Sequence, residues 1–137
     1  MASAVLKSGK VSLATLSPPN SCRVGSGLIC GADIVAGDPC YIKSDGLVYP
    51  SDGTAANAAA KVDGWAVTDA KLAQNDAVTL LTDIELRYGA GLTPGQRLFL
   101  DIAANYPGLA TAATTGGTAP VAFVIDATTI RVFQSKY

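Results

Sequence analysis

Histidine is absent from this sequence of 137 residues. It is the most common general base in enzymes and completes the Ser-His-Asp and Cys-His nucleophile arrangements, so these catalytic classes are excluded. The acidic residues are ten aspartates and a single glutamate, Glu85. Most aspartates stand beside glycine, asparagine or proline, where aspartate forms turns, and none of their spacings matches a calcium loop. The sequence therefore predicts a protein that is not an enzyme and holds no metal or cofactor, with an acid hydrolase as the distant alternative.

Charge and long hydrophobic runs are scarce as well. Charged residues make up 15% of the chain and the net charge is −1, whereas an average globular protein has about 25% charged residues. This balance predicts no basic face for nucleic acid. No run of about 18 apolar residues occurs, and no apolar segment follows Lys7 and Lys10, so we expect neither a membrane span nor a secretory signal. A surface so poor in charge is typical of a small β-domain or of a protein covered by partners.

Cysteine occurs three times, as Cys22, Cys30 and Cys40. The spacings are not those of a CxxC motif and no histidine completes a ligand set, so a zinc site is not expected. The sequence predicts buried, reduced thiols, and a Cys22–Cys30 disulfide is the alternative.

Turn signals are abundant. Three stretches share one outline of a turn followed by alternating apolar residues: IVAGDPCYI, LAQNDAVTL and LTPGQRLFL, at Ile34–Ile42, Leu72–Leu80 and Leu92–Leu100. We call them the turn–strand units. No helical periodicity of useful length appears, so the sequence predicts an all-β domain, a small β-barrel or β-tulip-like domain of short antiparallel strands. The residues expected to act only through backbone geometry in turns are Gly37, Asp38, Asp45, Gly46, Pro94 and Gly95.

The first twenty residues differ from the rest. Weak alternation at Val11, Leu13 and Leu16 is followed by Pro18 and Pro19. We expect residues 1–20 to form an extended N-terminal arm before a single β-domain at 21–137. Such an arm adds a strand to a sheet edge or lies along another subunit, and a partly mobile terminus is the alternative.

The single tryptophan, Trp65, is expected to anchor the core or an interface, with ligand stacking as the lesser interpretation. The predicted interface residues are therefore Val11, Leu13, Leu16, Pro18, Pro19 and Trp65.

Several motifs follow one another in a recognisable order: AGDPCYIKSDGLVYPSD, VDGWAV, GLTPGQRLFL and ATTIRVF, at Ala36–Asp52, Val62–Val67, Gly91–Leu100 and Ala127–Phe133. Together they resemble the capsid cement, or head decoration, proteins of tailed bacteriophages. The chain departs from that pattern at Pro39-Cys40 and in the arm before Cys22. The resemblance implies a homotrimer on the outer capsid surface of the virion, made in the host cytoplasm. It also implies contacts with the major capsid protein and with neighbouring trimers.

The sequence thus predicts a non-enzymatic capsid decoration protein. Two alternatives stay open. One is another virion module of the same kind, from a tail or baseplate. The other is a carbohydrate-binding module that stacks sugars on Trp65 and on Tyr41 or Tyr49.

Overall fold

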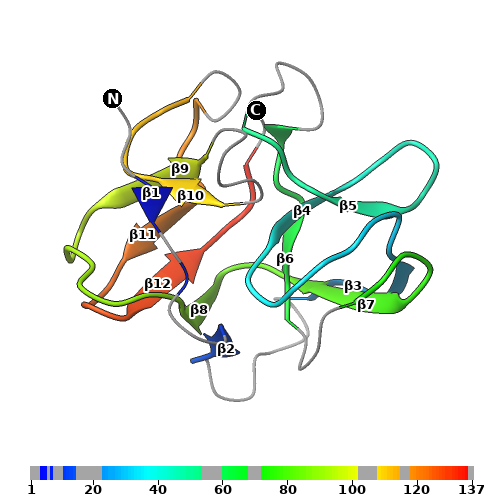
Figure 1. Ribbon diagram of the computed structural model, residues 1–137, viewed down its shortest axis with the longest axis horizontal. Coiled ribbons are helices and arrows are strands. Elements are labelled where there is room, and N and C mark those ends of the chain that lie inside the picture. Colours follow the sequence, from blue (N-terminus) through cyan, green and yellow to red (C-terminus); the bar gives the residue numbers. More distant parts are fainter. Residues whose placement is uncertain are drawn as a thin grey trace.

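The computed structural model describes residues 4–5, 7, 11–14, 23–53, 60–67, 72–101, 108–114 and 118–135. Within these ranges the chain is all-β, with two antiparallel sheets and no helix, so the predicted fold class is confirmed. The two sheets lie side by side (Figure 1). The described strands do not form a closed barrel.

The larger sheet has seven strands in the order β1-β10-β9-β11-β12-β8-β2. Every neighbouring pair in it is antiparallel. Its strands are β1 (Ala4–Val5), β2 (Ser12–Leu13), β8 (Ile84–Arg87), β9 (Arg97–Leu100), β10 (Leu109–Ala110), β11 (Ala122–Val124) and β12 (Thr129–Val132).

The smaller sheet has five strands in the order β3-β7-β6-β4-β5. It curls so strongly that its two edges meet at one point, where the Gly31 N–H donates to the Val48 carbonyl at 2.8 Å. This single bridge leaves the sheet curled but not closed. Its strands are β3 (Arg23–Ile29), β4 (Pro39–Ile42), β5 (Val48–Pro50), β6 (Gly64–Ala66) and β7 (Ala77–Leu81).

Two clusters of buried side chains hold the fold together. One lies within the five-stranded sheet and contains Cys30, Cys40 and Leu80. The other lies under the seven-stranded sheet but also takes in Trp65 and Leu81 from the five-stranded sheet. This second cluster therefore joins the two sheets by hydrophobic contact, the dominant favourable term in folding.

Alternating burial follows the sequence pattern closely. In β8, Ile84 and Leu86 are buried, whereas Glu85 is half-buried and Arg87 is exposed. Side chains of a strand point to opposite faces of a sheet in turn, so one face of β8 meets the core and the other faces outward. The sequence alternates apolar and charged residues over Ile84–Tyr88, and the burial of these side chains follows that alternation.

The three turn–strand units share one geometry. In each, the fourth turn residue donates its N–H to the carbonyl three residues earlier, from Asp38 to Val35, from Asp76 to Ala73 and from Gln96 to Thr93. The residue before each donor has positive φ, 83° at Gly37, 77° at Asn75 and 85° at Gly95. Positive φ at this position is what a type II turn requires. The strand that follows is β4, β7 or β9.

The first two units also contact each other. Ile34 and Leu72 exchange backbone hydrogen bonds of 2.9 and 2.7 Å. In both units the aspartate of the turn accepts the N–H three residues back, at 2.9 Å from Val35 to Asp38 and 2.8 Å from Ala73 to Asp76. The aspartates thus hold their turns closed by the local hydrogen bonding that favours this residue in turns.

Thr82, in the short connection from β7 to β8, has a buried hydroxyl group. Among the described residues its Oγ1 has no hydrogen-bond partner. We expect Thr82→Val to raise the free energy of unfolding by about 1 kcal/mol, because a buried hydroxyl without a partner costs more than a methyl group of similar shape. Urea denaturation measures the change. Thr79→Val, on half-buried Thr79 of β7, is the matched control and should stay within about 0.5 kcal/mol of the parent. A clear loss of stability in Thr82→Val would show that the hydroxyl is paired.

Candidate functional site

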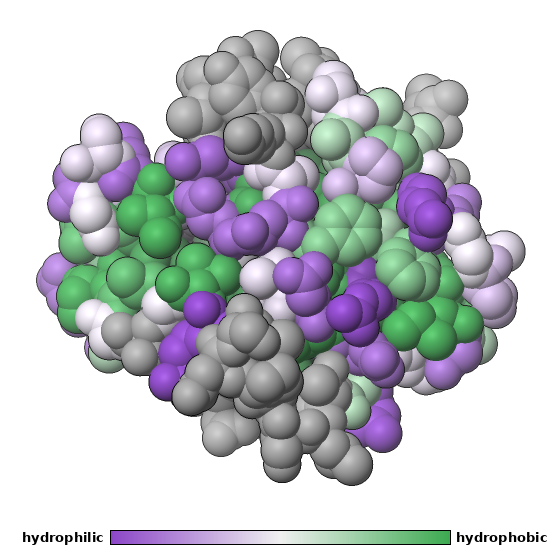
Figure 2. Space-filling view, turned by 180° about the vertical axis from the view of Figure 1, so that it is seen from behind, coloured by the Kyte–Doolittle hydropathy of each residue, from purple (hydrophilic) through white to green (hydrophobic). Residues whose placement is uncertain are grey.

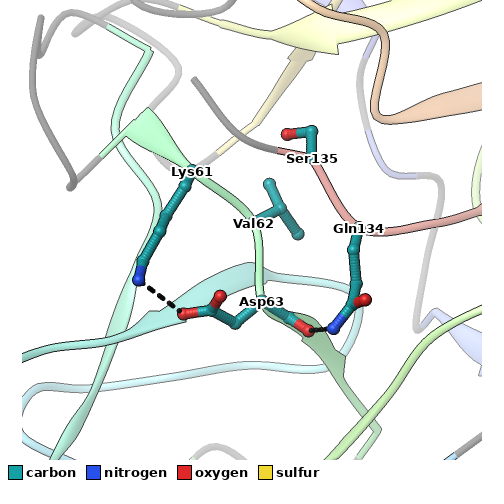
Figure 3. Close-up of a pocket in the computed structure, with 5 residues that line it drawn as sticks. All are labelled: Lys61, Val62, Asp63, Gln134 and Ser135. Atoms are coloured by element: carbon teal, nitrogen blue, oxygen red, sulfur yellow. Dashed lines mark hydrogen bonds and ion pairs between the residues drawn. The ribbon is translucent and has the colours of Figure 1, made fainter.

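A pocket of about 330 Å³ lies where the segment before β6 meets the end of the chain (Figure 3). Val62 and Ser135 exchange backbone hydrogen bonds of 2.9 and 3.0 Å along its wall. This bridge links the two sheets, because Val62 precedes β6 of the five-stranded sheet and Ser135 follows β12 of the seven-stranded sheet. The five lining residues are Lys61, Val62, Asp63, Gln134 and Ser135.

The polar groups of this pocket are largely satisfied by one another. The Asp63 carboxylate accepts the Ile42 N–H at 2.7 Å and lies 3.4 Å from the Lys61 ammonium group. The Gln134 amide donates to the Asp63 carbonyl at 2.7 Å, as the dashed line in Figure 3 shows. The carboxylate thus ties the segment before β6 to β4 within the five-stranded sheet, whereas the Asp63 carbonyl makes the contact with Gln134 across the junction.

The described part of the chain has neither a grouped set of metal ligands nor a long apolar helix. Within it, no group of three or more histidine, cysteine, aspartate or glutamate side chains is arranged to hold a metal ion. The same residues include no helix with the length and hydrophobicity of a membrane span.

The cysteines that can be placed belong to the core. Cys30 and Cys40 are free and fully buried. Burial raises the pKa of both thiols, that of Cys40 well above its ordinary value. The predicted buried thiols are confirmed for these two, and with Cys30 free the alternative disulfide to Cys22 is not formed. Cys22 itself lies outside the described residues.

The N-terminal arm is bound to the chain's own sheet wherever it is described. β1 pairs with β10, and β2 pairs with β8, so these residues add a strand at each edge of the seven-stranded sheet. Of the predicted interface residues, Val11 is buried against Gly37 and Leu13 packs against the core. Leu16, Pro18 and Pro19 lie outside the described residues.

A buried ion pair links the arm to the first turn–strand unit. The Lys7 ammonium group donates to the Asp38 carboxylate at 2.5 Å, and the Asp38 side chain is 3% exposed. Burial raises the pKa of Asp38, although the Lys7 charge and the hydrogen bonds from Lys7 and Val35 act in the opposite direction. Asp38, predicted as a turn former only, thus also binds the arm.

Trp65 is fully buried in the cluster that joins the sheets. Its indole N–H donates to the Phe133 carbonyl at 3.1 Å, across the junction. The structure therefore places this ring in the core of the single chain and not on its surface. It cannot stack on a sugar or reach a partner from this position, because no face of the ring meets solvent.

The β4–β5 hairpin carries the other predicted stacking residues. The rings of Tyr41 and Tyr49 are 5.9 Å apart at an interplanar angle of 31°, and the Lys43 ammonium group lies 5.1 Å from the Tyr49 ring centroid. The Tyr49 hydroxyl donates to Asp45 at 2.9 Å, which raises the pKa of Tyr49. Gly46 makes the hairpin turn with φ 84°. These contacts occupy the two rings with each other and with their own hairpin.

No family model matches the chain, and the searches of curated proteins and of solved structures returned no match. Its function must therefore be inferred from its own residues.

The sequence did not predict one surface that the structure shows. Arginines and phenylalanines that are scattered along the chain meet on the outward face of the seven-stranded sheet, where the Arg97 guanidinium lies over the Phe123 ring. Arg-Leu-Phe at Arg97–Phe99 and Arg-Val-Phe at Arg131–Phe133 already place both residue types on one side of a strand. Seen from behind, the described part of the surface carries patches of hydrophobic residues with hydrophilic residues between them (Figure 2).

Proposed function

We propose that this chain is a capsid decoration protein, which binds the outer surface of a tailed-phage head and stabilises the capsid lattice. The observation that supports the proposal is the order along the sequence of the four motifs that resemble those of capsid cement proteins. In the structure these motifs form the β4–β5 hairpin, β6, β9 and β12. Each motif alone is turn chemistry available to many β-domains, and the succession of all of them is more specific than any one.

The proposal includes a homotrimer that contacts the major capsid protein and neighbouring trimers. Association of proteins costs roughly 4–15 kcal/mol in lost freedom, so a decoration protein needs several contacts at once. A trimer on a repeating shell gains them by multivalency, since the first contact raises the effective concentration of the others. A chain with little charge loses little free energy in desolvating such contacts.

The experiment compares heads prepared with and without the protein, followed by addition of the purified protein to the depleted heads. Release of DNA on heating is followed with a fluorescent dye, and binding is followed by sedimentation. We expect the protein to sediment with the heads and to raise the temperature of DNA release. Identical release temperatures together with no sedimentation on heads would contradict the proposal.

Two further measurements separate the proposal from its alternatives. Electron cryomicroscopy of the particle places the protein on the head or, if it is a tail or baseplate module, elsewhere on the virion. Light scattering measures its mass in solution, where we expect a trimer. If the protein is a monomer in solution and a trimer on heads, the decoration function still holds, and the trimer forms only on the capsid.

A further inference from the structure

The outward face of the seven-stranded sheet gathers residue types that are rare in this chain. All three phenylalanines and three of the four arginines lie on it. Arg87 and Arg97 are exposed, and the phenylalanines are half-buried although none is part of the buried core. We call it the arginine–phenylalanine face, and its residues are Glu85, Arg87, Arg97, Phe99, Phe123, Arg131 and Phe133.

Strand register sets four of these residues in one row across the sheet. Phe123 of β11 is the partner of Arg97 in β9 and of Arg131 in β12, and Arg131 is in turn the partner of Glu85 in β8. Neighbouring strands lie about 4.8 Å apart, so the backbones at the two arginines are about 10 Å apart with a phenylalanine between them. The row is therefore arginine, apolar ring, arginine, carboxylate.

Contacts within the face hold the Arg97 side chain in place. The Arg97 guanidinium carbon lies 4.8 Å from the Phe123 ring centroid, and the Phe123 and Phe133 rings are 6.4 Å apart. A guanidinium placed over a ring still presents N–H donors at its edge, in the fork that matches a carboxylate. Among the described residues no carboxylate is paired with Arg97. Arg131 lies 3.9 Å from Glu85, with both side chains 41% exposed.

We infer that the arginine–phenylalanine face binds a protein surface on which carboxylates flank an apolar side chain. Charge complementarity supports this partner, because the face carries three arginines against Glu85 while the chain as a whole has a net charge of −1. Arginine–carboxylate pairs are often bidentate and are stronger than neutral hydrogen bonds. Arginine and aromatic residues are also enriched at the energetic centre of protein interfaces. This inference does not depend on the proposed capsid function.

Single-stranded nucleic acid fits the face less well. Bases stack on open aromatic rings, but Phe123 is covered by Arg97 and flanked by Phe133. Glu85 adds a carboxylate that repels phosphate. The rings therefore serve as apolar contact area beside the arginines and not as stacking platforms.

The test uses a synthetic peptide in which glutamate and leucine alternate at every second position, with threonine between. In an extended peptide, two glutamates that flank one leucine lie on the same side about 13 Å apart, within reach of both arginines. Amide chemical shifts of the ¹⁵N-labelled protein report where the peptide binds, and calorimetry gives its affinity. Control peptides replace glutamate by glutamine or leucine by serine, and a thymidine oligonucleotide represents single-stranded DNA.

We expect the glutamate peptide to shift amides of β9, β11 and β12, and both control peptides to bind more weakly. Combining Arg97→Gln with Arg131→Gln should weaken binding roughly tenfold or more, since about 1.4 kcal/mol is enough for a factor of ten. Arg23→Gln, at the exposed arginine of β3 on the other sheet, is the matched control and should leave the affinity unchanged. The amide spectra confirm that each variant is folded.

The inference would be overturned if the glutamate peptide did not bind, or if the glutamine peptide bound equally well. It would also be overturned if Arg23→Gln lost as much affinity as the double variant, or if the oligonucleotide bound the same strands more tightly than the peptide. The last would assign the face to nucleic acid.

Discussion

Trp65→Ala is expected to lower the free energy of unfolding by about 3–5 kcal/mol, the usual range for truncating a large buried aromatic residue. The ring is fully buried and lies in the cluster that joins the two sheets. Its removal leaves a cavity there and takes away the hydrogen bond to the Phe133 carbonyl. A loss of this size is a large fraction of the stability of an average domain, so the variant should also unfold at a markedly lower temperature than the parent.

Urea denaturation followed by circular dichroism measures this loss, because Trp65 is the only tryptophan and its fluorescence disappears with it. Trp65→Phe keeps most of the apolar volume but leaves the Phe133 carbonyl without its donor, so a loss of about 1–3 kcal/mol is expected. Tyr41→Ala, at a half-buried ring on the β4–β5 hairpin, is the matched aromatic control and should cost about 1 kcal/mol or less. If Trp65→Ala cost no more than Tyr41→Ala, the ring would lie at the surface and would again be a candidate anchor for a partner.

Local signals account for most of what the sequence predicted correctly. Alternation places Ile84 and Leu86 on one face of β8, because side-chain direction in a strand depends only on position. Gly37 and Gly95 lie at positions where the turn needs positive φ, and glycine adopts it without the steric cost that other residues have. These relations involve residues within a few positions of each other, so a single sequence contains them.

What the sequence did not predict depends on residues far apart. Lys7 meets Asp38 across 31 positions, and nothing near either residue specifies the other. The row of Arg97, Phe123 and Arg131 exists only because β11 pairs with both β9 and β12. The charge balance predicted no basic face for nucleic acid, and the strand pairing that gathers the arginines on one face was unknown. The same lack of pairing information left a barrel as the expectation where two sheets form.

Lys7→Met is expected to lower the free energy of unfolding by about 2–3 kcal/mol at pH 7. Removing one partner of a buried ion pair leaves the other charge without compensation, at a cost of about 3–5 kcal/mol for a fully buried pair. The Lys7 side chain is 22% exposed, which reduces the expected cost. Lys61→Met is the matched control, because Lys61 forms a more exposed pair with Asp63 at 3.4 Å. It should cost about 1 kcal/mol or less.

The pH dependence of the Lys7→Met penalty identifies Asp38 as its cause. Burial already raises the pKa of Asp38 in the folded protein, and loss of Lys7 removes the charge and the hydrogen bond that lower it. When the pKa of a carboxyl group is higher in the folded than in the unfolded protein, protonation stabilises the folded state at low pH. This stabilisation is lost as the pH rises through the folded pKa. The variant has the higher folded pKa, so its penalty should be largest at neutral pH. It should shrink on acidification toward about pH 4, near the pKa of an aspartate in an unfolded chain, as the carboxyl becomes increasingly protonated in both folded proteins. Urea denaturation of the parent protein and of Lys7→Met, at several pH values between neutral and about 4, measures how the penalty changes. A penalty that stays constant or grows on acidification would mean that Lys7 stabilises the arm through packing of its aliphatic stem and not through Asp38.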